Sequence, residues 1–165
     1  MLNFTFYKKG INFFGILVLG LFLNSSTQAA TRYAVASGNW NSTAVWSATA
    51  GGPAGASVPA AGDDVLFREL AGNPTITVTV TGNESCNSLD MLTDFGGTTG
   101  SMILVVNSGT TLNITGNAIL FGDNNATNVT RLTLNGTLTL GGNFSADGGG
   151  IANTCLVNMS GGASI

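Results

Sequence analysis

The sequence contains no histidine, and its only two lysines, Lys8 and Lys9, lie at the N-terminal end. Serine-type catalysis needs a base to take the hydroxyl proton, usually histidine and sometimes lysine. Neither base occurs after residue 30. Zinc sites built from cysteine and histidine are excluded in the same way, because Cys86 and Cys155 are the only thiols.

Positive charge is also scarce. Beyond residue 30 three arginines stand against eight acidic residues. The arginines are Arg32, Arg68 and Arg131. Proteins that bind nucleic acids neutralise phosphates with clustered Lys and Arg, and anionic membranes attract the same residues. We therefore expect no nucleic-acid partner and no attraction to an anionic membrane surface.

The first thirty residues have the features of an export signal. Lys8 and Lys9 precede an apolar stretch over residues 11–23, which is shorter than the roughly 20 residues needed to span a bilayer. Thr27-Gln28-Ala29 then supplies small residues at the two positions that a signal peptidase inspects. We predict a cleaved signal peptide over residues 1–30, a secreted or outer-surface location, and no membrane insertion after cleavage.

Alternating apolar residues follow in the rest of the chain. Ile76, Val78 and Val80 are separated by threonines, and the run ends at Gly82-Asn83. Similar alternation occurs at Leu112 and Ile114, at Leu132 and Leu134, and at Leu138 and Leu140. Strict alternation between turn residues predicts short strands with one buried face. No sustained helical period occurs after Ala30, so the sequence predicts an all-β chain.

The strands also recur at a longer interval. Val80, Val106, Leu134 and Met159 align at intervals in the mid-twenties. Leu112 aligns with Leu138, and Gly116-Asn117 aligns with Gly142-Asn143. A period of this length without helices indicates a solenoid. We predict a right-handed parallel β-helix, with a β-sandwich or jelly roll as the alternative, since their strands alternate in the same way.

The region 31–74 differs from the repeats over residues 75–165 and is predicted to cap their first edge. It holds both tryptophans, Trp40 and Trp46. Their simplest interpretation is packing within the cap; the alternative is an aromatic platform that stacks on sugar rings. A further copy of the repeat begins near Leu156, so we expect the repeats to be truncated at the C-terminal end.

A resemblance follows from several short motifs. They are Ser37-Gly38-Asn39-Trp40, Val45-Trp46, Pro59-Ala60-Ala61-Gly62-Asp63-Asp64-Val65-Leu66-Phe67, Thr77-Val78-Thr79-Val80 and Ser88-Leu89-Asp90-Met91. Together they resemble the N-terminal region of large exported adhesin-like β-repeat proteins of the Bacteroidetes phylum, many of which use type IX secretion. The resemblance implies a β-helical body and a surface or adhesion role, and it supplies no catalytic residues.

Two kinds of chemistry survive the missing bases. Carboxylate pairs can hydrolyse glycosides, and two pairs are close in sequence: Asp63 with Asp64, and Asp90 with Asp94. Neighbouring residues on a strand face opposite ways, which disfavours the first pair. A calcium-dependent lyase would need an arginine base, Arg68 or Arg131, but no acidic residues cluster around either in the sequence. We therefore expect no enzymatic activity.

No cofactor is expected, although a structural calcium ion remains an alternative. The loops 122–125 and 146–148 place Asp and Asn oxygens about one repeat apart. These residues are also ordinary turn formers, which is the favoured interpretation. Cys86 and Cys155 lie about three repeats apart, too far to bridge in a regular β-helix, so two free buried thiols are predicted.

The sequence thus predicts a non-catalytic, exported structural or adhesin-like surface module whose partners are surface glycans or extracellular matrix polymers. Two alternatives remain open. One is a carbohydrate-binding N-terminal segment of a larger polysaccharide-degrading enzyme, marked by exposed Trp40 or Trp46. The other is a spacer without any ligand.

Overall fold

The computed structural model describes residues 29–68, 70–72, 74–92, 100–122, 128–148, 155–160 and 164–165. Within these ranges the chain forms strands and turns and no helix, which confirms the prediction of an all-β chain. Accordingly, these ranges contain no helix with the length and apolar character needed to cross a bilayer. All of the predicted signal peptide except Ala29 and Ala30 lies outside the described residues.

The strands form three sheets, which we call A, B and C. Sheet A contains, in spatial order, β13 (Phe144–Asp147), β10 (Ala118–Phe121), β7 (Ser88–Leu92), β4 (Asp64–Phe67), β1 (Thr31–Ala34) and β3 (Trp46–Ser47). Sheet B contains β14 (Cys155–Met159), β11 (Val129–Leu134), β8 (Ser101–Val106), β5 (Ile76–Val80) and β2 (Gly38–Asn39). Sheet C contains β12 (Thr137–Leu140), β9 (Thr111–Ile114) and β6 (Glu84–Cys86).

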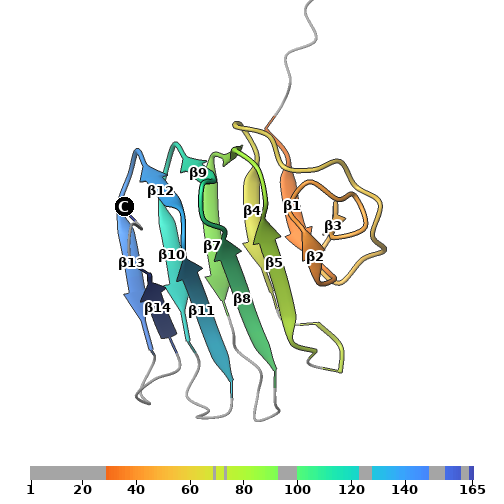
Figure 1. Cartoon of the computed structure of the whole chain (residues 1–165). Coiled ribbons are helices and arrows are strands. Elements are labelled where there is room, and N and C mark those ends of the chain that lie inside the picture. Colours follow the sequence, from red (N-terminus) through yellow and green to blue (C-terminus); the bar gives the residue numbers. More distant parts are fainter. Residues whose placement is uncertain are drawn as a thin grey trace, which may run out of the picture.

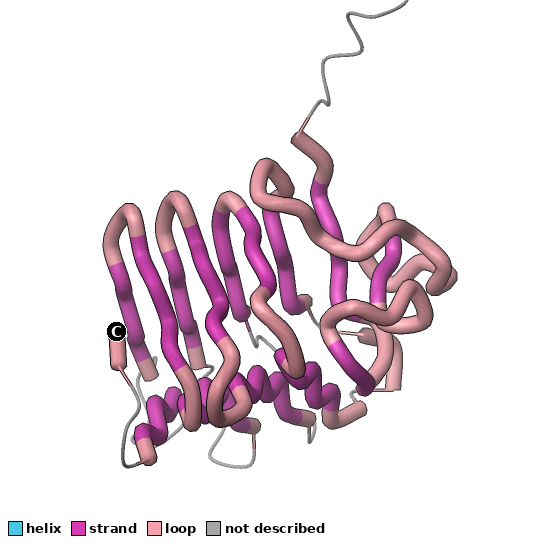
Figure 2. The backbone as a smooth tube through the Cα atoms, turned by 45° about the horizontal axis from the view of Figure 1, so that its top comes forward, coloured by secondary structure: helices cyan, strands magenta, loops and turns pink. Residues whose placement is uncertain are grey.

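From β4 onward the chain visits the sheets in a fixed order, A then B then C, and each strand pairs in parallel with the strand three further along. Figure 1 shows the resulting rows of equivalent strands, and Figure 2 shows the turns that join them. We call one passage through the three sheets a circuit. Among the described strands only β1 and β3 pair antiparallel. β-Sandwiches and jelly rolls are built from antiparallel sheets, so this pairing differs from the alternative fold.

The strand registers confirm the alignment that the sequence suggested. Val80 pairs with Val106, Val106 with Leu134, and Leu134 with Met159. In sheet C Leu112 pairs with Leu138. Because the side-chain direction alternates along a strand, one such match fixes which residues of every paired strand face inward.

The inward side chains of all three sheets join one hydrophobic core. Val65 on β4, Val78 on β5 and Cys86 on β6 belong to it, and each is buried. Burying an aliphatic side chain of this size stabilises the fold by about 1.5–3 kcal/mol. The core therefore ties the three sheets to one another, while the parallel ladders tie each circuit to the next.

Glycine and asparagine occupy the turns between sheets, and their roles differ. Gly136, between β11 and β12, lies so close to the carbonyl oxygens of Asn107 and Thr110 that a Cβ atom would collide with both. Asn117 instead uses its side chain: its Oδ1 accepts a hydrogen bond from the backbone N–H of Asn143 at 2.9 Å. Turns of successive circuits are thereby bonded to each other without β-ladder pairing.

The region predicted as a cap contributes to the sheets as well. β1 pairs in parallel with β4, and β4 with β7, so the ladder of sheet A begins at Thr31. β3 pairs with the other edge of β1 and occupies the end of sheet A. The tryptophans lie on the segment that follows β2 and on β3, at the same end of the molecule.

Candidate functional site

Trp40 and Trp46 are completely buried, at 0% exposure each. Their ring centroids are 5.0 Å apart with the planes inclined at 70°, and Trp46 also meets Phe67 edge to face at 6.4 Å. The indole Nε1 of Trp46 donates to the backbone carbonyl of Trp40 at 2.6 Å, whereas Nε1 of Trp40 is buried with no hydrogen-bond partner.

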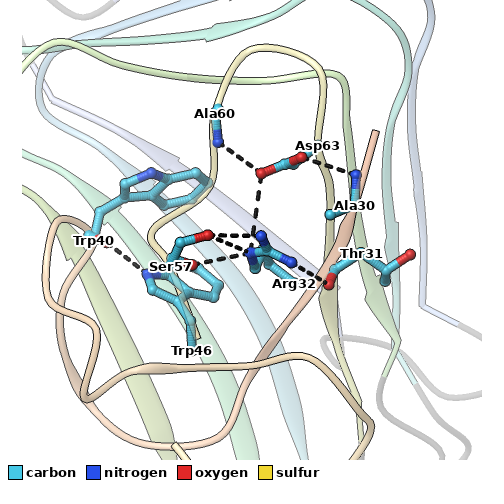
Figure 3. Close-up of polar contacts among 8 residues, drawn as sticks. All are labelled: Ala30, Thr31, Arg32, Trp40, Trp46, Ser57, Ala60 and Asp63. Atoms are coloured by element: carbon cyan, nitrogen blue, oxygen red, sulfur yellow. Dashed lines mark hydrogen bonds and ion pairs between the residues drawn. The ribbon is translucent and has the colours of Figure 1, made fainter. Parts of the chain in front are cut away.

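This geometry bears directly on the sugar-stacking alternative. A sugar ring needs one open face of an aromatic ring, and neither indole offers one. The two tryptophans instead fill the core at the end of sheet A that β3 occupies, and Figure 3 shows them close together. Their arrangement supports the packing interpretation, and a binding surface has to be sought elsewhere.

A polar cluster closes the same end of the molecule next to the tryptophans. Asp63, which is 8% exposed, accepts hydrogen bonds from the backbone N–H groups of Ala30 at 2.9 Å and Ala60 at 3.0 Å. Arg32 Nε lies 3.9 Å from the Asp63 carboxylate and donates to the carbonyl oxygen of Ser57 at 2.9 Å. Figure 3 shows these groups converging from β1 and from the loop before β4. The carboxylate thus holds Ala30 against the loop 48–63 between β3 and β4, which we call the cap loop.

On the outer face of sheet A, polar side chains link neighbouring strands. Arg68 donates to the Asp90 carboxylate at 2.5 Å and to the Asp90 carbonyl at 3.2 Å. Asp64 accepts from Asn87 Nδ2 at 2.8 Å and from Ser88 Oγ at 2.6 Å. These contacts join β4 to the next circuit, so Asp64 and Asp90 are used in structural contacts.

Of the two carboxylate pairs considered from the sequence, only Asp63 and Asp64 are both described, and their side chains bind different groups. Asp63 binds the backbone amides of Ala30 and Ala60, while Asp64 faces the outer surface of sheet A with Asn87 and Ser88. Asp94, the proposed partner of Asp90, lies outside the described residues.

Both cysteines are free thiols, as predicted. Cys86 is fully buried on β6 of sheet C, whereas Cys155 on β14 of sheet B is only half-buried, so the prediction of burial holds for Cys86 alone. Burial, followed by the nearby charges of Asp64 and Asp63, raises the pKa of the Cys86 thiol to about 12. A thiol with such a raised pKa stays protonated at neutral pH and is therefore a poor nucleophile.

Of the two loops considered for calcium, residues 123–125 lie outside the described residues, while residues 146–148 are described. Within the described part of the chain no three acidic or thiol side chains come together as metal ligands. The calcium alternative thus has no described ligand cluster to support it.

The outer face of sheet B has a composition unlike that of sheet A. Its strands present threonine, aliphatic and amide side chains between the inward residues: Thr77, Thr79, Ser101, Ile103, Val105, Val129, Arg131, Thr133, Leu156 and Asn158. The only charged residue among them is Arg131. By contrast, the outward positions of sheet A include Asp64, Asp90 and Asp147.

Arg131 lies in the middle of this face, with Ile103 of β8 on one side and Leu156 of β14 on the other. Its side chain donates to no described residue, and its Nε is buried without a hydrogen-bond partner. Arg32 and Arg68, the other described arginines, both bind carbonyls and carboxylates of the chain itself. Among the described residues Arg131 therefore has no ion-pair partner, and its guanidinium has the chemistry to bind a carboxylate or sulfate.

Sequence reasoning considered Arg131 only as a catalytic base and did not identify this face as a binding surface. The alternation of Val129, Arg131 and Thr133 with the inward Thr130, Leu132 and Leu134 could have placed Arg131 outward. The aliphatic neighbours on β8 and β14 come from other circuits, so only the strand register reveals them.

Comparisons of the chain with protein-family models, curated proteins and solved structures found no match.

Proposed function

We propose that this chain is a non-catalytic, exported module of the cell surface, whose outer face of sheet B adheres to acidic glycans. The observation that carries the proposal is Arg131, whose Nε has no hydrogen-bond partner and whose guanidinium forms no ion pair among the described residues. It lies at the centre of a face whose described outward residues include no carboxylate. This function agrees with the adhesin-like resemblance and with the predicted signal peptide over residues 1–30.

We also propose that the three sheets are the faces of a right-handed parallel β-helix. The fixed order A, B, C, the parallel registers and the single core shared by all three sheets support it. Crossovers between parallel strands are right-handed in nearly all proteins. A crystal structure with left-handed crossovers or with separate cores would contradict this architecture.

The chemistry of the face selects a glycan over a peptide. Extended peptides bind sheets through backbone groups at an edge, but the backbone groups of β8 and β11 are already paired on both sides. Contact must therefore come from side chains: hydroxyls of Thr77 and Thr133, aliphatic groups of Ile103 and Leu156, and the Arg131 guanidinium. A uronic-acid polymer offers matching hydroxyls, C–H surfaces and carboxylates.

Binding of the mature chain to polygalacturonate, alginate and neutral dextran tests the proposal. We expect the two acidic polymers to bind and dextran not to bind, with affinity falling as salt rises. Arg131→Gln removes the guanidinium and is expected to weaken binding roughly tenfold or more, the effect of losing one charge-assisted hydrogen bond.

Arg68→Gln is the matched control, because Arg68 is also a surface arginine but is bound to Asp90. We expect it to bind acidic polymers like the wild type. Binding that is unchanged in Arg131→Gln, or preference for an acidic peptide over the polymers, would sink the proposed adhesive face. No binding to any polymer would leave the spacer interpretation as the better one.

Export has its own test. The full chain with a C-terminal tag is expressed in a Bacteroidetes host, and protease is added to intact cells. We expect loss of the tag, and by mass spectrometry an N-terminus at the end of the predicted signal peptide, which is Ala30 for a cut directly after Thr27-Gln28-Ala29. A tag protected until the cells are lysed contradicts the surface location.

A further inference from the structure

A cut directly after Thr27-Gln28-Ala29, one residue inside the predicted boundary at residue 30, would leave Ala30 as the new N-terminus. Ala30 is held at both ends of its peptide unit. Its backbone nitrogen donates to Asp63 Oδ1 at 2.9 Å, and its carbonyl accepts from the backbone nitrogen of Asp64 at 2.9 Å. Ala29, just before it, is exposed. A cut after Ala29 therefore leaves the nitrogen of Ala30 beside the Asp63 carboxylate (Figure 3).

We propose that removal of the leader creates an ion pair between the new α-ammonium of Ala30 and the Asp63 carboxylate, so that processing itself locks the N-terminal cap. The proposal rests on the cleavage and export in the proposed function. We call Ala30 and Asp63 the maturation latch, because the α-ammonium charge that stabilises the cap exists only after the leader has been removed.

The covalent step is hydrolysis of the Ala29–Ala30 peptide bond by one water, catalysed by a signal peptidase of the cell. The leader keeps a new carboxylate on Ala29. Ala30 keeps the nitrogen, which becomes an amine and takes up a proton at neutral pH. A neutral amide donor to Asp63 is thereby replaced by a charged one at the same place, and charge-assisted hydrogen bonds are roughly twice as strong.

The surrounding charges favour the exchange. Before cleavage the cation nearest to the Asp63 carboxylate is the guanidinium of Arg32, whose Nε lies 3.9 Å away. The side chain of Asp63 is only 11% exposed, so the pair is poorly screened by solvent. Cleavage adds a positive charge on the nitrogen of Ala30, which lies 2.9 Å from Asp63 Oδ1 and is therefore closer than Arg32.

The composition of the chain makes this testable by simple chemistry. Because Lys8 and Lys9 are the only lysines, a chain that starts at Ala30 has its α-amine as its only amine. Acetylation then removes that charge and restores an amide like that of the unprocessed chain. Reductive dimethylation modifies the same atom but keeps the charge and one N–H.

We expect acetylation to lower the melting temperature at pH 6.5 by about 3–6 °C, and dimethylation to lower it by much less. In Asp63→Asn the acetylated and dimethylated chains are expected to melt together. If that variant does not fold, the comparison of the two modified wild-type chains still decides. Equal melting temperatures for the acetylated and dimethylated wild-type chains would overturn the ion pair.

The two proposals fail separately. Mass spectrometry of the exported protein showing an N-terminus other than Ala30 overturns the processing step, whatever the melting curves show. Loss of glycan binding in the experiment on Arg131 leaves the latch untouched, because Arg131 lies on sheet B and the latch lies at the start of sheet A.

Discussion

Two tryptophans of the same burial play different roles at the level of single atoms. Trp46 donates its Nε1 hydrogen to the carbonyl of Trp40 at 2.6 Å, while Nε1 of Trp40 is buried without a partner. A buried donor without an acceptor costs about 1–3 kcal/mol, and so does a buried acceptor that loses its donor. The two indoles are therefore unequal although both are inaccessible to solvent.

Substitution by phenylalanine separates these roles. We expect Trp46→Phe to lower the free energy of unfolding by about 1–3 kcal/mol more than Trp40→Phe, because only the former strands the carbonyl of Trp40. Urea denaturation followed by circular dichroism measures both, with each variant acting as the volume-matched control of the other. Equal losses would show that the hydrogen bond adds nothing beyond packing.

The thiol of Cys86 makes stability depend on pH. Its pKa is raised from 9.0 to about 12, chiefly by burial and then by the charges of Asp64 and Asp63. The unfolded chain thus loses this proton at lower pH than the folded chain, so the stability contributed by the neutral thiol is present below pH 9.0 and is lost as pH rises towards 12. We expect the unfolding free energy of the wild type to fall relative to that of Cys86→Ala over this range.

Thiol reactivity at pH 8 is a second test of the burial of Cys86. Burial also raises the pKa of Cys155, but a backbone hydrogen bond at Asp147 opposes that rise, and the residue is only half-buried. We expect Cys155 in the Cys86→Ser variant to react with a disulfide reagent at least tenfold faster than Cys86 in the Cys155→Ser variant. The opposite order would contradict the placement of Cys86 in the core.

At the level of the elements, the turns between sheets decide which residues can connect the strands. Gly136 joins β11 to β12 where the carbonyls of Asn107 and Thr110 leave no room for a side chain, whereas a Cβ at Gly62, before β4, would meet nothing within 4 Å. We expect Gly136→Ala to cost about 2–4 kcal/mol of unfolding free energy and Gly62→Ala to stay within about 0.5 kcal/mol of the wild type. Thermal or urea denaturation measures both, and a neutral Gly136→Ala would mean that neighbouring turns shift freely.

The sequence was informative about elements wherever alternation was uninterrupted. Val80, Val106 and Leu134 were aligned correctly because each ends a run of alternating aliphatic residues before a Gly or Asn turn. The same reasoning did not predict β1. Arg32 stands there in the inward row beside Val65, and a charged residue in that row hides the pattern until its partners at Ser57 and Asp63 are known.

The candidate site was harder to find for a related reason. Trp40 and Trp46 attracted attention because aromatic residues often bind sugars, but their burial depends on the fold of the cap loop, which has no periodic pattern. Arg131 becomes distinctive only when β8 and β14 are placed on either side of it. A surface formed by strands of several circuits can be recognised from the strand register, but not from the sequence of any single strand.

At the scale of the whole molecule, the two ends differ in how well their apolar side chains are buried. The end at β3 is filled by both tryptophans, whereas at the end formed by β13 and β14 the inward Met159 is 51% exposed. Regions with less buried apolar surface open at lower cost than the global unfolding free energy. We therefore expect the circuits to open from the β14 end first.

The chain carries natural reporters for this order, Trp40 and Trp46 at one end and Cys155 at the other. In rising urea we expect Cys155 of the Cys86→Ser variant to become fully reactive before the midpoint of the tryptophan fluorescence change. The fluorescence of the same variant without reagent is the control for effects of labelling. Coincident transitions would instead show that all circuits unfold as one unit.

The equivalence of Val80, Val106 and Leu134 has a consequence for how such a molecule changes length over evolutionary time. Duplicating the gene segment from one of these positions to the next inserts one strand into every sheet and extends the body by about 4.8 Å. Duplication of whole repeats therefore changes the length of the molecule without changing the end that contains Trp40 and Trp46.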